Sequence, residues 1–241
     1  MNSRSRQNYQ QRQERMIKDL KAGRLVPAKA AIRANYLKDY AKDKRRCLTT
    51  VAFVPDTLAE RITKKVIAPL KSIEPDFHFY SKESLHTTIE GIRTVSDPPL
   101  FTPQEVNSAS DLFSRLVPTL PAFSFRFKGL IAFPANSPTS ISLTGYCDER
   151  LRTVVRALDK GLERIGVSYN DSYHYSKDVF FGTIAVCRFT HKPREAFIKK
   201  VNDLGRIDLG EMLVDRLNLI VCNLVCDLKS REIIASYNLK T

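Results

Sequence analysis

The string His86-Thr87-Thr88 holds the residue types in this sequence that are best suited to acid–base chemistry. Imidazole, with an unperturbed pKa of about 6.5, can give or take a proton near neutral pH, and a threonine hydroxyl can donate a hydrogen bond to an anion. His86 and Thr88 are two residues apart, so in an extended strand both side chains point to one face. On a helix the same spacing would separate them. The motif therefore predicts a strand that presents an imidazole and a hydroxyl side by side.

The other three histidines have simpler explanations. His78 lies in an aromatic run, where packing accounts for it, and His191 falls at an expected turn. His174 begins a second His-x-Ser string with Tyr175 and Ser176, and an exposed loop is its simplest placement. Tyrosines on such a loop can stack on a nucleic-acid base, although loop tyrosines usually only pack. These residues are secondary candidates.

Other kinds of active site find no support in the sequence. It has no Gly-x-Gly-x-x-Gly string, P-loop or Gly-x-Ser-x-Gly elbow, and its histidines and cysteines are not at zinc spacing, so we expect no cofactor and no metal. No apolar run is long enough for a membrane span, and the start lacks a secretory signal. The cysteines are odd in number and scattered, which favours reduced, buried thiols in a cytoplasmic protein (Cys47, Cys147, Cys187, Cys222, Cys226).

Strand and helix patterns alternate along the chain around these residues. Strands are expected over 47–54, 77–80, 85–92, 123–133, 140–145, 179–189, 217–227 and 232–239, and helices over 3–21, 28–43, 58–73, 103–117, 149–165 and 195–204. Asp56 or Thr57 can cap the third helix, and glycines at 23, 166 and 205 are plausible helix stops. No helix pattern is long enough for a bundle, so the alternation favours an α/β or α+β architecture.

The positive charge is concentrated at the N-terminus. The net charge is +13, and residues 1–46 hold 14 Lys or Arg against four Asp or Glu. Residues 47–241 are left with 25 basic and 22 acidic residues. A basic arm on a nearly neutral body suggests a surface for a polyanion, with nucleic acid first in line. A solvated tail without such a role is an equally good reading of the charge alone.

The segment Ser84-Leu85-His86-Thr87-Thr88-Ile89 resembles the first motif of the two-histidine (2H, LigT-like) phosphoesterases, His-x-Ser/Thr-hydrophobic. The order of the flanking segments is similar as well. A strand ending in proline and a helix precede the motif (51–55), a glycine-to-Phe-Pro segment follows it (129–134), and a strand and a long helix lead to the place of the second motif (151–166, 179–186). The resemblance covers about the last four-fifths of the chain.

That family implies an α+β, bilobal fold, in which two antiparallel sheets face a central cleft and the helices lie outside. It also implies a metal-independent hydrolase acting on RNA or nucleotide 2′,3′-cyclic phosphates and on 2′–5′ or 3′–5′ oligonucleotide linkages. Each lobe contributes one His-x-Thr motif; one histidine accepts a proton from the attacking oxygen and the other protonates the leaving oxygen. Carried over to this sequence, Thr88 would donate to a phosphoryl oxygen, while Nε2 of His86 would reach the attacking or leaving oxygen.

The second motif departs from the family pattern. Aligning it on Thr183 places Phe181 where the second histidine should stand, and a phenyl ring cannot exchange a proton. Three explanations are open: a degenerate protein that binds RNA ends or nucleotides with little turnover, a substitute proton carrier such as His174, or an altered or divergent sequence in which a histidine has been replaced. Loss of one acid–base partner typically costs a factor of roughly 100 to 10,000 in rate.

These observations give one set of expectations. Residues 1–46 form a basic helical extension and residues 47–241 form the 2H phosphoesterase-like domain. The catalytic residues are expected to be His86, Thr88 and Thr183, and the residues that contact substrate are expected to be Phe181, His174, Tyr175 and Arg188. The expected partner is RNA or an oligonucleotide, reached in part through the basic extension, and the chain is expected to be a monomer. The alternative, from another class, is a catalytically degenerate protein that binds RNA or a partner on the same scaffold.

Overall fold

The computed structural model describes residues 3–25, 36–133, 138–167 and 178–241. Its strands are β1 (Arg46–Phe53), β2 (His78–Phe79), β3 (His86–Ser96), β4 (Phe123–Phe133), β5 (Ser140–Cys147), β6 (Gly182–Arg188), β7 (Asp208–Val214), β8 (Arg216–Cys222) and β9 (Glu232–Asn238). Its helices are α1 (Ser3–Lys21), α2 (Asp56–Ile62), α3 (Ala68–Lys71), α4 (Pro103–Leu116), α5 (Arg150–Arg164) and α6 (Glu195–Asp203).

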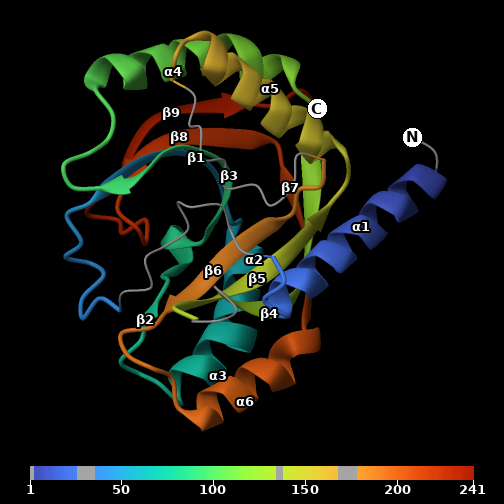
Figure 1. The fold of residues 1–241 in the computed structure, drawn as a ribbon, viewed down its shortest axis with the longest axis vertical. Coiled ribbons are helices and arrows are strands. Elements are labelled where there is room, and N and C mark those ends of the chain that lie inside the picture. The colour runs from blue at the N-terminus through green and yellow to red at the C-terminus, as the bar shows by residue number, and fades with distance from the viewer. Residues whose placement is uncertain (1–2, 26–35, 134–137, 168–177) are drawn as a thin grey trace.

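The strands form two antiparallel sheets. The first sheet has the order β3-β1-β8-β9, and the second has the order β2-β6-β5-β4-β7. Helices α4 and α5 lie beside the first sheet, whereas α3 and α6 lie at the other end of the molecule (Figure 1). The expected α+β architecture of two antiparallel sheets with helices outside is therefore confirmed.

Each sheet is covered by helices through large apolar side chains. On the first sheet, the Phe113 ring of α4 meets the Tyr237 ring of β9 edge to face at 6.2 Å. Below the second sheet, Phe197 of α6 meets Phe189 at 5.6 Å, just beyond β6. Helix α4 begins at a capping box between Thr102 and Glu105, which satisfies backbone N–H groups that the helix leaves without partners. Apolar side chains of α4 and α6 thus pack against the first and the second sheet, respectively.

Several expected elements differ in the structure. The helix expected over 58–73 begins at Asp56 after Pro55, with no side-chain cap, so capping by Asp56 or Thr57 is wrong; a π-helical turn over Thr63–Ile67 separates α2 from α3. Strand β7 was not expected, because Gly210, at φ +89°, interrupts its alternation. The strand expected over 217–227 ends at Cys222.

The helix expected over 28–43 is also wrong where it can be checked. Residues 36–43 are turns and bends, and residues 26–35 lie outside the described part of the chain. Tertiary contacts fix this backbone instead. The Tyr40 hydroxyl donates to the Phe189 carbonyl at 2.8 Å, and the Tyr40 carbonyl accepts from the Asn223 side-chain amide at 3.2 Å. Residues 36–45 therefore connect the end of β6 with the segment after β8.

Helix α1 packs onto the body of the protein. Five of its side chains recur at helical spacing and are all buried: Tyr9, Gln13, Met16, Ile17 and Leu20. Chain direction changes after α1 at Gly23, as expected from the sequence, in the left-handed conformation that glycine adopts at low cost (φ +68°). The helical part of the N-terminal extension is thus a structural element with one apolar face.

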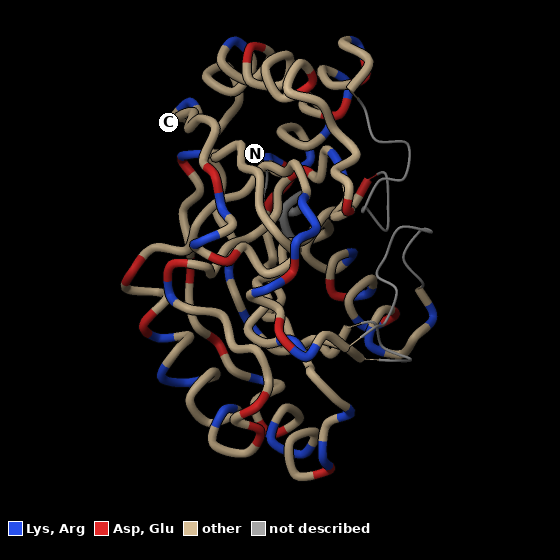
Figure 2. Tube along the Cα trace, turned by 90° about the vertical axis from the view of Figure 1, so that its left-hand side faces the viewer, with Lys and Arg blue, Asp and Glu red and all other residues tan. Residues whose placement is uncertain are grey.

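Charged side chains of both signs are spread over the surface. In Figure 2, the positions of Lys and Arg and those of Asp and Glu are interspersed along the trace, including the helices at both ends. The body therefore shows no single basic face in that view, in keeping with its near-neutral sequence.

No helix in the described residues is long and apolar enough to cross a membrane.

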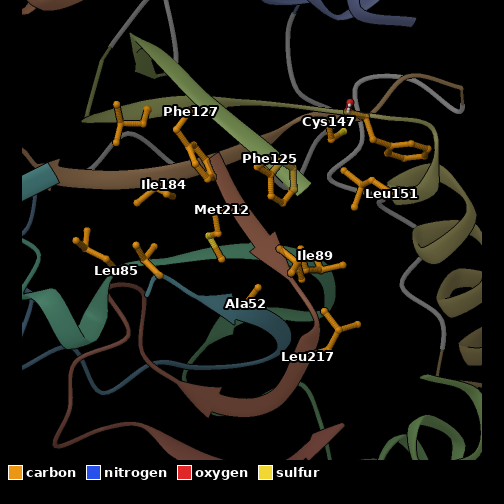
Figure 3. Packing of buried hydrophobic residues seen from close by; sticks show 14 of the residues in the cluster. Ala52, Leu85, Ile89, Phe125, Phe127, Cys147, Leu151, Ile184, Met212 and Leu217 are labelled. Atoms are coloured by element: carbon orange, nitrogen blue, oxygen red, sulfur yellow. Dashed lines mark hydrogen bonds between the residues drawn. The ribbon is translucent and has the colours of Figure 1, made fainter. Parts of the chain in front are cut away.

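The two sheets meet in a shared apolar core at β3 and β6. Figure 3 shows Ala52 and Ile89 from the first sheet facing Met212 and Phe125 from the second. A side chain at Gly182 would place its Cβ 2.6 Å from the Phe125 ring and 3.0 Å from Oγ1 of Thr87. Only a residue without a side chain allows β6 to come this close to both. Gly182 therefore sets how closely the two motif strands approach.

We expect Gly182→Ala to lower the free energy of unfolding by about 1 to 3 kcal/mol, because overpacking forces rings or backbone to move. Gly205→Ala is the matched control, since its Cβ would meet nothing within 4 Å. Denaturant unfolding of both variants measures the difference. Equal stabilities would show that the β3–β6 approach tolerates a methyl group.

Candidate functional site

The first motif places its two polar side chains on the outer face of the first sheet. Leu85, Thr87 and Ile89 are buried toward the core, while His86 is half-buried and Thr88 is exposed. This is the alternation that the two-residue spacing predicts. In the β1–β3 ladder His86 stands opposite Phe53 and Thr88 opposite Val51, so these residues share the outer face. The imidazole and the hydroxyl are therefore neighbours, as expected.

A backbone contact orients the His86 ring. Its Nδ1 lies 2.7 Å from the Ser84 carbonyl oxygen, which can only accept, so the neutral ring carries its proton on Nδ1. Nε2 is then the lone-pair nitrogen and can take a proton from an oxygen nucleophile. The short 3₁₀ turn Lys82–Ser84, which precedes β3, supplies that carbonyl. Local backbone geometry thus leaves Nε2 without its own proton and able to accept one.

Tyr80 connects His86 with Arg188 on the neighbouring lobe. The rings of Tyr80 and His86 are 6.4 Å apart, and Nε of Arg188 donates to the Tyr80 hydroxyl at 3.0 Å. Burial raises the pKa of Tyr80, and the Arg188 cation acts in the opposite direction. The phenol is therefore neutral and accepts the hydrogen bond from the guanidinium. Arg188, expected from the sequence as a substrate contact, is linked to the first motif only through Tyr80.

A second arginine lies at the start of β3. Nη1 of Arg231 donates to the Glu83 carbonyl at 2.7 Å, and its guanidinium lies 4.6 Å from the centre of the Phe53 ring. Phe53 is the residue opposite His86 in the ladder. Cation–π contact and hydrogen bond together fix the position of this charge. Arg188 and Arg231 thus give the surroundings of His86 a positive character that suits an anionic ligand.

The second motif contributes a hydroxyl without an imidazole. Thr183 is exposed and stands opposite Thr144 in the β5–β6 ladder, on the outer face of the second sheet. Phe181 is half-buried and packs against the main core. β3 and β6 are adjacent in space although they belong to different sheets. Thr88 and Thr183 therefore both face outward from neighbouring strands.

Helix α1 fixes the backbone immediately before Phe181. The Tyr9 hydroxyl accepts from the Phe180 N–H at 2.9 Å, and Nε2 of Gln13 donates to the Phe180 carbonyl at 2.6 Å. Nε2 of Gln13 also lies 3.0 Å from Sγ of Cys147. Because both backbone groups of Phe180 are satisfied by α1, the N-terminal helix positions the second motif strand.

His78 lies closer to this site than its sequence context suggested. It stands opposite Arg188 in the β2–β6 ladder, and its ring lies between those of Tyr40 at 5.6 Å and Tyr80 at 5.5 Å. Burial, reinforced by the Arg188 cation, lowers the pKa of His78. The aromatic packing expected for His78 is therefore present, on a ring that is neutral at pH 7.

The expected site residues divide into two groups. His86, Thr88, Thr183, Phe181 and Arg188 lie on or beside β3 and β6, whereas His174 and Tyr175 lie outside the described residues. Sequence reasoning missed two contributors, Tyr80 and Arg231. Tyr80 could have been found because it lies two residues after His78, on the same face of an extended segment. No comparable spacing in the sequence points to Arg231. Among the described residues no group of three or more His, Cys, Asp or Glu is arranged to hold a metal ion.

Solved structures share this arrangement over most of the chain. A Thermus thermophilus protein, TT0787, superposes with a TM-score of 0.59 at 17% identity, covering 81% of this chain and 98% of its own. Escherichia coli LigT in complex with NADP+ gives 0.54 at 12% identity, covering 82% and 99%. The chain has the LigT-like fold. No family model matches the sequence, and a search of curated proteins finds no match.

The LigT-like fold agrees with the resemblance drawn from the first motif. A structure titled simply as a phosphoesterase superposes with a TM-score of 0.55 at 11% identity, covering 82% of this chain and 100% of that one. Other E. coli LigT structures are described as complexes with 3′-AMP, ATP and phosphate. At these identities the likeness establishes the fold, and the chemistry of this chain depends on its own residues.

The middle residue of the first motif gives a stability prediction. Oγ1 of Thr87 is buried without a hydrogen-bond partner among the described residues, whereas Oγ1 of Thr144 donates to the Lys128 and Gly129 carbonyls. An unsatisfied buried hydroxyl costs about 1 to 3 kcal/mol. We expect Thr87→Val to leave the free energy of unfolding unchanged or raise it by about 1 kcal/mol, and Thr144→Val to lower it by about that amount. Chemical denaturation of both variants tests the contrast; a loss at Thr87 as large as that at Thr144 would contradict it.

Proposed function

We propose that the chain binds RNA or nucleotide phosphodiesters across β3 and β6 and hydrolyses 2′,3′-cyclic phosphate or 2′–5′ and 3′–5′ linkages slowly. Thr88, Thr183, Arg188 and Arg231 would contact the phosphate oxygens. His86 would move the proton through Nε2. The expected setting is a monomer in the cytoplasm, and both of these stay predictions.

The observation that carries the proposal is the orientation of His86. An imidazole whose Nδ1 is held by the Ser84 carbonyl, with two arginines and a threonine hydroxyl nearby, offers a proton acceptor beside an anion site. The LigT-like fold supports it, because E. coli LigT structures are described with nucleotides and phosphate. Each of those ligands is, or carries, a phosphate group.

Only the first lobe would supply a side chain that transfers a proton in the reaction. In hydrolysis, neutral His86 takes a proton from the attacking water while the arginines balance charge on the phosphate. The leaving oxygen then departs without a histidine at position 181 to protonate it. His78 would be a poor proton donor, because its lowered pKa keeps it neutral at pH 7. Its neutral state and the absence of a histidine at 181 favour slow turnover, and they also support the second candidate, a protein that binds RNA ends without hydrolysing them.

Restoring the second histidine separates these possibilities. We expect Phe181→His to raise turnover of 2′,3′-cyclic nucleotides by about 100- to 10,000-fold, because it returns the acid–base partner that the wild type lacks. Product formation from 2′,3′-cyclic nucleotides and short 2′–5′ and 3′–5′ oligonucleotides, followed by chromatography, measures this. Phe181 is half-buried, so an unchanged denaturation midpoint should accompany the comparison.

His86→Ala is the control in both backgrounds. It should abolish turnover in the wild type and in Phe181→His, while Thr87→Val, whose side chain points into the core, should leave turnover unchanged. Tight nucleotide binding with no turnover in either background would favour the binding protein. Turnover that survives His86→Ala would exclude His86 as the proton carrier.

The basic N-terminal extension is proposed to lengthen the RNA footprint. Arg12, Arg15 and Lys18 are exposed on the side of α1 away from its buried stripe. Because α1 holds the backbone of Phe180, its basic side lies on a helix that is fixed to the second motif strand. A polyanion bound at β6 could therefore continue onto this helix.

Replacing these three cations tests the footprint without removing the helix. The triple variant Arg12→Gln, Arg15→Gln, Lys18→Gln should reduce the slope of log affinity against log salt by up to about 2, since each lost contact to a single strand contributes about 0.7. Binding of a single-stranded RNA measured at several salt concentrations gives the slope. Lys64→Gln, Lys65→Gln, Lys71→Gln removes equal charge at exposed positions of the α2–α3 segment and should change the slope little. Equal slopes in both triples would contradict a role for α1.

A further inference from the structure

Three of the five cysteines gather on the outer face of the first sheet, and one of them, Cys226, faces the Arg231 guanidinium. Cys47 of β1 and Cys222 of β8 stand directly opposite each other, and their sulfur atoms are 3.6 Å apart. Cys226, four residues later, is buried in the same small cluster as Cys222. Cys147 and Cys187 are buried elsewhere in the main core. The trio is therefore a local arrangement, which the scattered sequence positions do not suggest.

The Cys47–Cys222 pair has the geometry that a disulfide needs. The bonded sulfur distance is about 2.05 Å, so the two atoms must approach by only about 1.5 Å. Opposed residues of an antiparallel pair have Cα atoms about 4.5 to 5.5 Å apart, within the range that disulfides span. Cys47 is half-buried, whereas the other four cysteines are buried. A small oxidant can therefore reach one sulfur of the pair from solvent.

The third thiol supplies a place for the proton that must leave. Cys226 shares a hydrogen bond with Cys222, and the nearby Arg231 cation also favours its anion, so its pKa falls to about 6. Nη1 of Arg231 lies 4.0 Å from Sγ of Cys226. The hydrogen bonds to Cys226 and Cys47 and burial raise the pKa of Cys222, which therefore stays protonated and donates to the Cys226 thiolate. The cluster thus combines a Cys226 sulfur whose anion is favoured with a Cys222 thiol that keeps its proton.

We propose that Cys47 and Cys222 form an oxidant-sensitive modification site that closes to a disulfide in the presence of a peroxide. Cys47 sulfur takes one oxygen atom from the peroxide, giving a sulfenic acid and an alcohol or water. Cys222 sulfur then attacks the Cys47 sulfur, and the S–O bond breaks with hydroxide as the leaving group. The Cys222 proton passes to the Cys226 thiolate, and the hydroxide takes a proton from solvent to become water. In sum, two thiols are oxidised by two electrons, and one peroxide is reduced.

The site adjoins the residues that orient His86. Arg231, which faces Cys226, also donates to the Glu83 carbonyl, and the next residue, Ser84, holds Nδ1 of His86. Protonation of Cys226 during oxidation removes the anion that faces Arg231. The modification does not depend on the proposed hydrolase activity, because the bond can be detected in a protein that turns over nothing.

Peptide mapping of the full-length protein tests the pairing directly. After exposure to hydrogen peroxide, free thiols are alkylated and the protein is digested with trypsin without reduction. Cys47 falls in the peptide 47–61, and Cys222 and Cys226 share the peptide 217–229. We expect a species joining these two peptides, which dithiothreitol separates. The bond between Cys222 and Cys226 would instead leave 217–229 alone and two hydrogens lighter.

Alanine variants identify the partners. Cys47→Ala and Cys222→Ala should each abolish the joined species, while Cys226→Ala should keep it and only slow its formation. Cys147→Ala, at a buried thiol outside the trio, is the matched control and should change nothing. Absence of the joined species at peroxide levels that oxidise other thiols, or a bond found only within 217–229, would overturn the proposal. If Cys226→Ala lost the joined species while Cys222→Ala still formed it, the bond would join Cys47 and Cys226. That result would also overturn the proposal.

Discussion

The close approach of β3 to β6 is the constraint on which the rest of the structure depends. At the junction of the two sheets β3 and β6 come close together, and Gly182 provides the space for Phe125 and Thr87. With a side chain at that position the lobes would have to separate or the core side chains rearrange. Leu85 just before β3, Ile89 of β3 and Ile184 of β6 then face the shared core. The alternation of a strand sends the polar motif residues to the opposite side.

This division explains why the first motif was readable from sequence. A period of two fixes which side chains share a face, regardless of what the strand pairs with. His86 and Thr88 therefore had to be neighbours once residues 85–92 were extended, and Thr87 had to face the core. The same reasoning gave most strands and helices of the body to within a few residues, but it missed β7. It also placed Thr183 and Phe181 on or beside the second motif strand, with the proton carrier missing.

Other features depend on contacts between residues far apart in the chain, which no local pattern encodes. Tyr40 is held by Phe189 and Asn223, and those contacts replace the helix that its spacing predicted. Arg231 reaches Glu83 across 148 positions in sequence. The basic extension presented only charge in the sequence, so its buried stripe and its hold on Phe180 became apparent only in the fold. Because Gln13 and Tyr9 are buried, α1 is an integral part of the body, and its basic side chains lie on the exposed side of the helix.

The two lobes are thus unequal in a way that bears on mechanism. The first lobe has an oriented imidazole, and the second has a hydroxyl and an arginine, with the half-buried Phe181 ring at the position that we propose for a second histidine. His78 does not restore the balance, since its ring lies between two tyrosines beside the Arg188 cation and stays neutral. Phosphate binding needs only donors and positive charge, which both lobes retain. In the proposed reaction, hydrolysis additionally needs a proton delivered to the leaving oxygen, so we expect a change at position 181 to alter the rate of the reaction much more than the affinity of the site.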